Sequence, residues 1–408
     1  MQFEARSEER RPFVFGKGAI CSGSRNMSGF QHLSVDGFRR LCGVELELRP
    51  LSVMIGANGS GKTSVLDVLS LLAASAQGRL AENLSDLGGI TGVLATGRAN
   101  RLSFGLSFEV AGHEPLRYHL SISPSGIGYT IDAESLTQVR ETYREPFKHI
   151  DSDGHAIRYF DTNTGKLLPP QWEQLSGQTS LAQVPKMFPE PEQFRRRLAS
   201  STLYHTLDVG PRSPVRLPQP IRPAKLPGKD GEDLATCLYG MREAEPDRFE
   251  AVEDALRAAF PGFERLSFPP VAAGTLAMIW RDRNFPKGFY THQLSEGMLR
   301  FLWLVTLLQS ADLPVVTMLD EPEVSLHPEL LSLLAGLLRE ASQRSQIIVA
   351  THSDRLVRFL SPKEVIVADL TDSGVTKLTW ADSLDLERWM DEYTLDRVWA
   401  MGRLGGRA

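Results

Sequence analysis

The run Gly56-Ala57-Asn58-Gly59-Ser60-Gly61-Lys62-Thr63 matches the phosphate-binding pattern G-x-x-x-x-G-K-[ST] at every fixed position. The apolar stretch 51–55 before it predicts a buried strand, and the stretch 64–72 after it predicts a helix. In that context, backbone N–H groups and the positive end of the helix dipole can bind phosphate oxygens. A glycine-rich turn without a ligand is the alternative, and the agreement of both flanks argues against it. We therefore expect a nucleotide site over residues 56–64, which includes Ser64, with Lys62 on the β- and γ-phosphates and Thr63 on Mg²⁺.

The bulk composition excludes several classes of protein. The chain has 408 residues, 42% hydrophobic and 23% charged, with a net charge of −5, which is typical of a globular protein and gives no whole-chain argument for nucleic-acid binding. Cys21, Cys42 and Cys237 are scattered, which argues against a disulfide scaffold or a zinc site. No apolar run is long enough to span a membrane. We expect a cytoplasmic protein with no membrane partner.

Paired acids follow an apolar stretch in the C-terminal third. Residues 314–319 predict a buried strand, and Asp320 and Glu321 come directly after it. Ligands of open α/β sheets bind at the carboxyl ends of the strands. We expect Asp320 to hold Mg²⁺, directly or through water, and Glu321 to orient and activate an attacking water. A solvated loop start is the alternative.

A second strand-end residue follows. Residues 346–350 predict another apolar strand, and His352 comes two positions after it. An isolated histidine is more often structural. The place of His352, one strand after the paired acids, favours a hydrogen bond from its side chain to the γ-phosphate or the attacking water. We therefore assign Lys62, Glu321 and His352 to catalysis.

A third motif lies upstream of both, in Gln293-Leu294-Ser295-Glu296-Gly297-Met298, which opens a predicted helix. Ser295 and the N–H groups near Gly297 could bind phosphate at the helix N-terminus. The alternative is a simple N-cap by Ser295 with no ligand. Because the chain already has one phosphate loop, a second such site suggests that two chains meet head to tail around ATP.

Together these motifs resemble the ABC-type ATPases. The order is phosphate loop, L-S-x-G, aliphatic strand with Asp-Glu, and strand-end histidine. The stretch Glu323-Val324-Ser325-Leu326-His327-Pro328 is similar to the RecF-like, OLD-family and SMC-like branch, and most to stand-alone bacterial proteins labelled AAA family ATPase. Gly37-Phe38-Arg39 and Gly88-Gly89 add to the resemblance.

The resemblance implies a fold and a division of the chain. The fold is α/β, an ABC-type P-loop NTPase with a mixed sheet core, an antiparallel β subdomain and an α-rich, irregular insertion. We expect a poorly ordered extension over 1–26, the N-terminal half of the core with the β subdomain over 27–136, the insertion over 137–270, and the C-terminal half over 271–408.

The resemblance also implies partners and a role. It implies an ATP- and Mg²⁺-dependent homodimer in which Ser295 contacts the partner's γ-phosphate, with residues 325–328 at the interface. It further implies a role in DNA repair or anti-phage defence, with DNA and a separately encoded effector protein, a nuclease or toxin, as candidate partners.

The chain departs from the family pattern at two places. The Mg²⁺-sensing glutamine has only weak candidates, Gln77 and Gln219. The OLD-type nuclease domain has no room after His352, although that segment contains Asp382, Asp385, Glu387, Asp391 and Glu392, so we expect no nuclease in this chain.

The proline-rich stretch 211–229, with five basic residues and no acid, is either a solvated loop or a nucleic-acid-facing loop. Two other functions stay open. One is the nucleotide-binding subunit of a transporter, against which the wide spacing of Lys62 and Ser295 argues. The other is a scaffold that binds nucleotide without turnover.

Overall fold

The computed structural model describes residues 29–405, apart from residues 111, 141–144, 155, 162–163, 174, 176, 186–187, 273, 387–388 and 390–392. The extension expected over residues 1–26 lies outside the described residues, as do Glu387, Asp391 and Glu392 of the C-terminal acids.

The centre of the molecule is a six-stranded sheet in the order β10-β16-β17-β3-β18-β19. Neighbouring strands are parallel except at the β18–β19 hairpin. β3 is buried along its whole length, which explains its unbroken apolar sequence. The strands are β3 (Leu51–Gly56), β10 (Thr202–Tyr204), β16 (Val316–Asp320), β17 (Gln346–Ala350), β18 (Val365–Leu370) and β19 (Thr376–Trp380).

Helices cover both faces of this sheet, and β3 contributes to two hydrophobic cores. Val53 and Ile55 pack into the core formed with α7, α8, α9 and α11, whereas Met54 packs into the core formed with α1 and α4. This alternation is the period-2 pattern of a strand with two covered faces. The helices are α1 (Lys62–Ala76), α4 (Pro189–Ser200), α7 (Glu296–Gln309), α8 (Leu330–Ser342), α9 (Asp354–Val357) and α11 (Leu395–Ala400).

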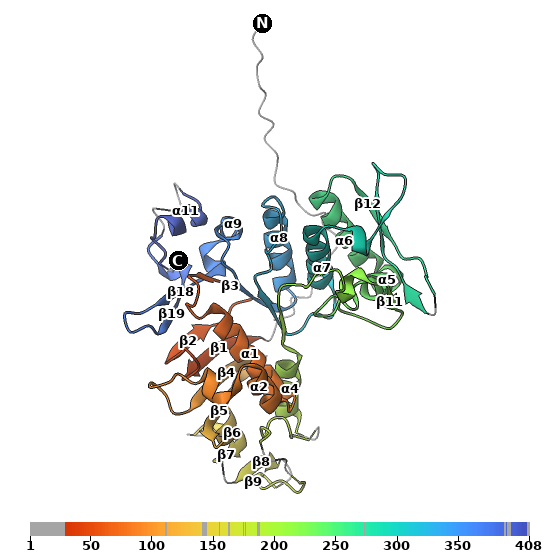
Figure 1. Cartoon of the computed structure of the whole chain (residues 1–408). Helices are drawn as coiled ribbons and strands as arrows, with labels where there is room; N and C mark the ends of the chain where they lie inside the picture. Colours follow the sequence, from red (N-terminus) through yellow and green to blue (C-terminus); the bar gives the residue numbers. More distant parts are fainter. Residues whose placement is uncertain are drawn as a thin grey trace.

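A second sheet of eight antiparallel strands lies on the α1 side of the core, in the lower part of Figure 1. Its order is β2-β1-β4-β5-β6-β7-β8-β9, so it continues to Leu168, beyond the boundary expected at residue 136. The strands are β1 (Phe30–Asp36), β2 (Val44–Glu47), β4 (Leu102–Val110), β5 (His113–Ser125), β6 (Gly128–Gln138), β7 (Phe147–Ser152), β8 (Ile157–Asp161) and β9 (Lys166–Leu168), with α2 (Leu80–Asp86) and α3 (Gly89–Val93) between β3 and β4.

The helical part of the expected insertion forms a separate lobe at the upper right of Figure 1. Two helices of this lobe are α5 (Leu234–Ala244) and α6 (Pro246–Ala259), in the insertion that we expected to be α-rich. A three-stranded sheet in the order β12-β14-β15 and the two-stranded β11-β13 complete the lobe. These strands are β11 (Gln219–Pro220), β12 (Phe263–Ser267), β13 (Thr275–Leu276), β14 (Ile279–Asp282) and β15 (Phe289–Tyr290).

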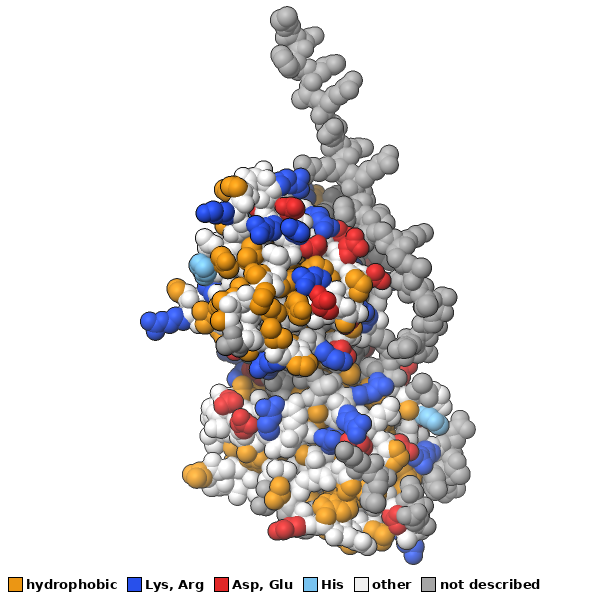
Figure 2. All heavy atoms as spheres, turned by 90° about the vertical axis from the view of Figure 1, so that its right-hand side faces the viewer, with side chains coloured by type: hydrophobic (Ala, Val, Ile, Leu, Met, Phe, Trp, Pro, Cys, Tyr) orange, Lys and Arg blue, Asp and Glu red, His pale blue; other side chains and the backbone are white. Residues whose placement is uncertain are grey.

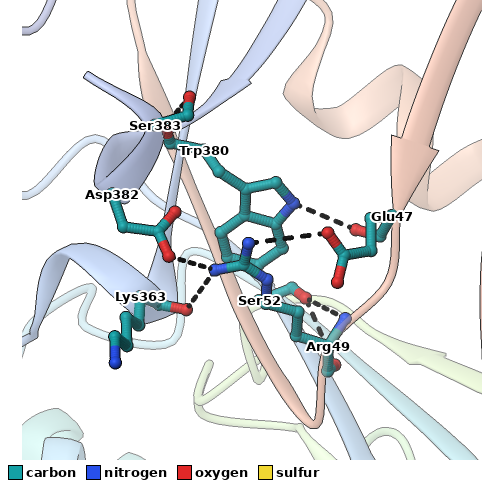
Figure 3. Close-up of polar contacts among 7 residues, drawn as sticks. All are labelled: Glu47, Arg49, Ser52, Lys363, Trp380, Asp382 and Ser383. Atoms are coloured by element: carbon teal, nitrogen blue, oxygen red, sulfur yellow. Dashed lines mark hydrogen bonds and ion pairs between the residues drawn. The ribbon is translucent and has the colours of Figure 1, made fainter.

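A polar cluster around Arg49 joins the two sheets (Figure 3). The Arg49 guanidinium lies 3.9 Å from the ring centroid of Trp380, and its Nη1 lies 2.8 Å from Oδ2 of Asp382. Nε1 of Trp380 donates to the backbone oxygen of Glu47 over 3.2 Å. Asp382, one of the acids of the C-terminal segment, therefore has a structural contact that holds β19 against the β2–β3 turn.

Candidate active site

The phosphate loop connects the end of β3 to the start of α1, in the expected strand–loop–helix arrangement. Gly56, Gly59 and Gly61 have φ values of 149°, 75° and 104°, in the region that favours glycine. An added Cβ at Gly56 would collide with the backbone oxygen of Ala368, and one at Gly61 would collide with the side chain of Thr376. The β18–β19 hairpin thus packs directly against the loop.

Lys62 is the first residue of α1 and is 3% exposed. Its Nζ donates to the backbone oxygens of Gly56 and Ala57, each over 2.8 Å, and lies 3.5 Å from Nδ1 of His352. Burial lowers the pKa of Lys62 to about 8, although the nearby carboxylates of Asp320 and Glu321 act in the opposite direction. The ammonium therefore lies at the junction of the phosphate loop, the paired acids and the histidine.

The paired acids and the histidine meet because their strands are neighbours. β16 lies beside β17, and β17 lies beside β3, so the loops after all three strands open at one edge of the sheet. The backbone N–H of Glu321 donates to Ala350 over 2.8 Å, and Glu321 has a positive φ of 50°. Oε1 of Glu321 lies 3.8 Å from Nε2 of His352. A positive φ such as that of Glu321 is uncommon for a residue other than glycine and often occurs at functional sites.

Thr63 and Ser64 occupy the first turn of α1, where Thr63 is exposed and Ser64 is buried. Oγ of Ser64 accepts a hydrogen bond from Nη1 of Arg39 over 3.4 Å, and the same Nη1 lies 2.6 Å from Oδ2 of Asp67. Arg39 also has a positive φ, of 49°. The Gly37-Phe38-Arg39 stretch thus places the guanidinium of Arg39 beside the phosphate-loop helix, a contact that the sequence pattern did not indicate.

The residues present are chemically suited to Mg²⁺. The hydroxyl of Thr63 and the carboxylate of Asp320 are oxygen donors, the type that Mg²⁺ prefers, and Mg²⁺ is usually held by few protein groups together with phosphates and water. In the described part of the chain, no cluster of three or more His, Cys, Asp or Glu residues could hold a metal ion.

His205 is a neighbour of Asp320 that sequence reasoning missed. It directly follows β10, which pairs with β16, and its Nδ1 lies 3.7 Å from Oδ2 of Asp320. The nearby carboxylate of Asp320 raises the pKa of His205. Gln77 follows the last turn of α1, at the opposite end from the phosphate loop, and Gln219 is buried against Gly231 and Ala235. Neither candidate for the metal-sensing glutamine reaches the acids in the structure.

Glu323 is another residue near the site whose role the sequence did not indicate. Its Oε1 accepts a hydrogen bond from Oγ1 of Thr351, the residue before His352. Its Oε2 is buried without a partner among the described residues, and burial raises the pKa of Glu323. Glu323 therefore holds the loop that contains His352.

Ser295 is the N-cap of α7, and its Oγ accepts the N–H of Met298 over 3.3 Å. The capping alternative raised by the sequence is thus present, and the exposed side chain remains available to a second chain. Gly297 packs against the backbone oxygen of Ser325, where an added Cβ would lie only 2.8 Å away. Ser325 has a positive φ of 63° and contacts Arg300 of α7.

The proline-rich stretch 211–229 is tied to the rest of the protein. Nη1 of Arg216 donates to the backbone oxygens of His292 and Leu294 over 3.1 and 3.0 Å, directly before Ser295. Arg222 pairs with Asp233, and Lys225 pairs with Asp312. Three of its five basic residues therefore make contacts within the chain, and Arg216 fixes the loop that leads into α7.

A known protein family matches the part of the chain that contains these motifs. Residues 51–358 match the family described as "AAA domain, putative AbiEii toxin, Type IV TA system". The chain belongs to this family. The match runs from β3 to α9 and so includes the phosphate loop, Ser295, the paired acids and His352.

Solved structures place this AAA-domain protein in the fold of SMC heads. The crystal structure of an SMC head bound to the C-terminal winged-helix domain of ScpA is similar with a TM-score of 0.54 and 15% identity, covering 86% of this chain and 97% of that one. An SMC head with an extended coiled coil, bound to the C-terminal domain of ScpA derived from Pyrococcus furiosus, gives 0.53 and 14%, covering 90% and 98%. No curated protein matches the chain. Among the described residues, no helix is long and apolar enough to cross a bilayer.

Proposed function

We propose that this AAA-domain protein hydrolyses ATP in the cytoplasm and that two copies close around the nucleotide. The observation that carries the proposal is the convergence of Lys62, Asp320, Glu321 and His352 from three neighbouring strands at one edge of the core sheet. Phosphoryl transfer requires mainly positioning and neutralisation of charge, and these are the side chains that supply them.

Each residue has a role in the proposed reaction. The phosphate loop and Lys62 bind the β- and γ-phosphates, and Glu321 orients the attacking water. His352 donates a hydrogen bond to the γ-phosphate or to that water. Thr63 and Asp320 would hold Mg²⁺, which neutralises charge that develops on the phosphates.

The second copy completes the site in this proposal. Ser295 is exposed at the N-terminus of α7, so its hydroxyl and the nearby N–H groups can contact the γ-phosphate bound by the other copy. Only the closed dimer then contacts the γ-phosphate from both sides, and hydrolysis opens it. Following the family resemblance, we propose that this switch acts in DNA repair or anti-phage defence with a separately encoded effector.

A steady-state ATPase assay with and without DNA tests the proposal, with Lys62→Ala as the inactive control. We expect Mg²⁺-dependent phosphate release that is lost in the variant. Nucleotide binding without release would instead identify a scaffold without turnover. Co-purification with a membrane subunit would favour the transporter alternative.

A further inference from the structure

The outer face of the three-stranded sheet in the helical lobe carries two opposed arginines. Arg265 of β12 pairs directly with Arg281 of β14 in the register of the sheet. Like charges opposite one another destabilise a sheet unless an anion lies near. Glu253 is close enough to Arg265 for their charges to interact. However, Oε2 of Glu253 already lies 3.0 Å from Nη2 of Arg257, and its Oε1 accepts the N–H of Leu266. The pair is therefore poorly neutralised within the chain.

Further uncompensated positive charge surrounds this pair. Nε of Arg281 is buried without a partner among the described residues. Arg283 and Lys287 are exposed in the turn that follows, and, like Arg281, they have no ion pair within the described part of the chain. The single acid of this turn, Asp282, accepts the N–H of Asn284 over 2.9 Å and is outnumbered by Arg281, Arg283 and Lys287. This positive region lies on a chain whose net charge is −5.

Aromatic rings lie beside these cations. Tyr290 pairs with Ile279, two residues before Arg281, so Tyr290 and Arg281 share one face of the sheet. Tyr290 is 45% exposed and stacks on His292 with an interplanar angle of 12°. Phe285, in the turn, is 55% exposed, and its ring centroid lies 5.0 Å from that of Phe289. Figure 2 shows the molecule from the right-hand side of Figure 1, with Lys, Arg, Asp, Glu and hydrophobic side chains interspersed on its upper part.

We propose that this basic–aromatic face, defined by Arg265, Arg281, Arg283, Phe285, Lys287 and Tyr290, binds single-stranded nucleic acid. Guanidinium and ammonium groups suit the phosphates, and exposed rings give bases a surface on which to stack. A duplex keeps its bases stacked internally, so it would use the charges but not the rings. The combination of both features favours a single strand over a duplex and over an acidic protein.

The face is connected to the proposed ATPase site. The backbone N–H of Tyr290 donates to Oε1 of Gln293 over 2.9 Å, and this turn leads directly to Ser295. A strand stacked on Tyr290 would bias the position of the α7 N-terminus and thereby change ATP turnover. This coupling rests on the proposed function, whereas the binding itself does not.

Fluorescence anisotropy of the full chain with labelled dT20, U20 and a 20-base-pair duplex tests the binding. We expect at least one single strand to bind more tightly than the duplex. Arg281→Gln with Arg283→Gln should reduce the magnitude of the salt slope by about 1.4, because each phosphate contact with a single strand contributes about 0.7. Phe285→Ala and Tyr290→Ala should each weaken binding about 5- to 100-fold, and Tyr290→Phe should bind as the wild type.

Lys225→Gln is the matched control, because Lys225 is exposed in the same lobe but pairs with Asp312 at 2.9 Å. It should leave binding almost unchanged. The proposal is overturned if no single strand binds, if the duplex binds more tightly, or if Lys225→Gln weakens binding as much as the double arginine variant. It is also overturned if the aromatic variants alter only the dimer mass, which would assign the face to a second copy.

The Lys62→Ala variant separates this proposal from the proposed function. It should bind single strands as the wild type does in the absence of nucleotide, even though it hydrolyses no ATP. Normal binding with no ATPase activity in the wild type would remove the proposed function and leave the nucleic-acid face in place. Normal ATPase activity in a wild-type protein that binds no single strand would remove the nucleic-acid face and leave the proposed function in place.

Discussion

Oε1 of Glu321 lies 3.8 Å from Nε2 of His352, and Nδ1 of the same ring lies 3.5 Å from Nζ of Lys62. The imidazole thus lies between a carboxylate and an ammonium that come from two other strands. Burial and the charge of Lys62 lower the pKa of His352, against the opposing effect of Glu321 and Asp320. A neutral ring at pH 7 can donate from one nitrogen and accept at the other, as our account of the proposed hydrolysis requires.

Replacing the proposed base should separate nucleotide binding from turnover. Glu321→Gln keeps the size of the side chain but cannot orient and activate water as a carboxylate does. We expect ATP affinity within a few-fold of the wild type and phosphate release lower by about 10²- to 10⁴-fold. Equilibrium binding of a fluorescent ATP analogue and a phosphate-release assay measure the two quantities. Turnover at the wild-type rate would show that Glu321 is not the base.

The loop that contains His352 should depend on Glu323, which accepts a hydrogen bond from the hydroxyl of Thr351, the residue before His352. Glu323→Ala removes this acceptor, so we expect kcat to fall about 10-fold or more while KM for ATP changes little. Glu323→Gln retains one acceptor oxygen and should recover part of kcat. A change confined to KM, or equal values for the two variants, would contradict a positioning role.

ATP affinity should fall as the pH rises above about 8. Burial lowers the pKa of Lys62 to about 8 in the free protein, so the amine is mostly charged below that pH and mostly neutral above it. Bound phosphate favours the charged form, and binding in this range must therefore take up a proton. Titrations of a nucleotide analogue from pH 6.5 to 9.5 measure the effect. Lys62→Arg, which stays charged, should give a flatter profile, whereas equally flat profiles for both proteins would refute the explanation.

The Arg49 cluster should contribute to the stability of the junction between the two sheets (Figure 3). Arg49→Ala removes the stacking on Trp380 and the ion pair with Asp382, and we expect the free energy of unfolding to fall by about 1–2 kcal/mol. Arg49→Lys keeps the charge but loses the planar contact with Trp380. It should therefore recover only part of the free energy of unfolding that Arg49→Ala loses. Urea unfolding measures both. Lys148→Ala, which breaks an exposed ion pair with Asp151, is the control and should change stability by less than about 0.5 kcal/mol.

The sequence was sufficient where a pattern is local. A glycine loop between a strand and a helix, and polar residues directly after apolar strands, predicted the surroundings of Lys62, Asp320 and His352. The neighbours His205, Arg39 and Glu323 depend on which strands pair across the sheet, and this pairing leaves no local signal. β10 is only three residues long, so the residue beside Asp320 could not be found from the sequence.

The domain boundary that we expected at residue 136 was likewise beyond what local sequence patterns can predict. β7, β8 and β9 are short strands with mixed polar sequences, and they join the sheet by extending a ladder that β6 already provides. Their strand character comes from the neighbouring strand rather than from a strong pattern of their own. The contacts of Arg216 with the loop before Ser295 are equally long-range.

The mass of the Glu321→Gln variant in solution, measured by sedimentation with and without ATP, tests the central claim most directly. Our account predicts the mass of one chain without nucleotide and of two chains with ATP and Mg²⁺, because the variant retains ATP. Adding Ser295→Arg, which places a bulky charge at the α7 N-terminus, should restore the mass of one chain. A single-chain mass with saturating ATP, or a dimer that forms equally well without ATP, would contradict the account.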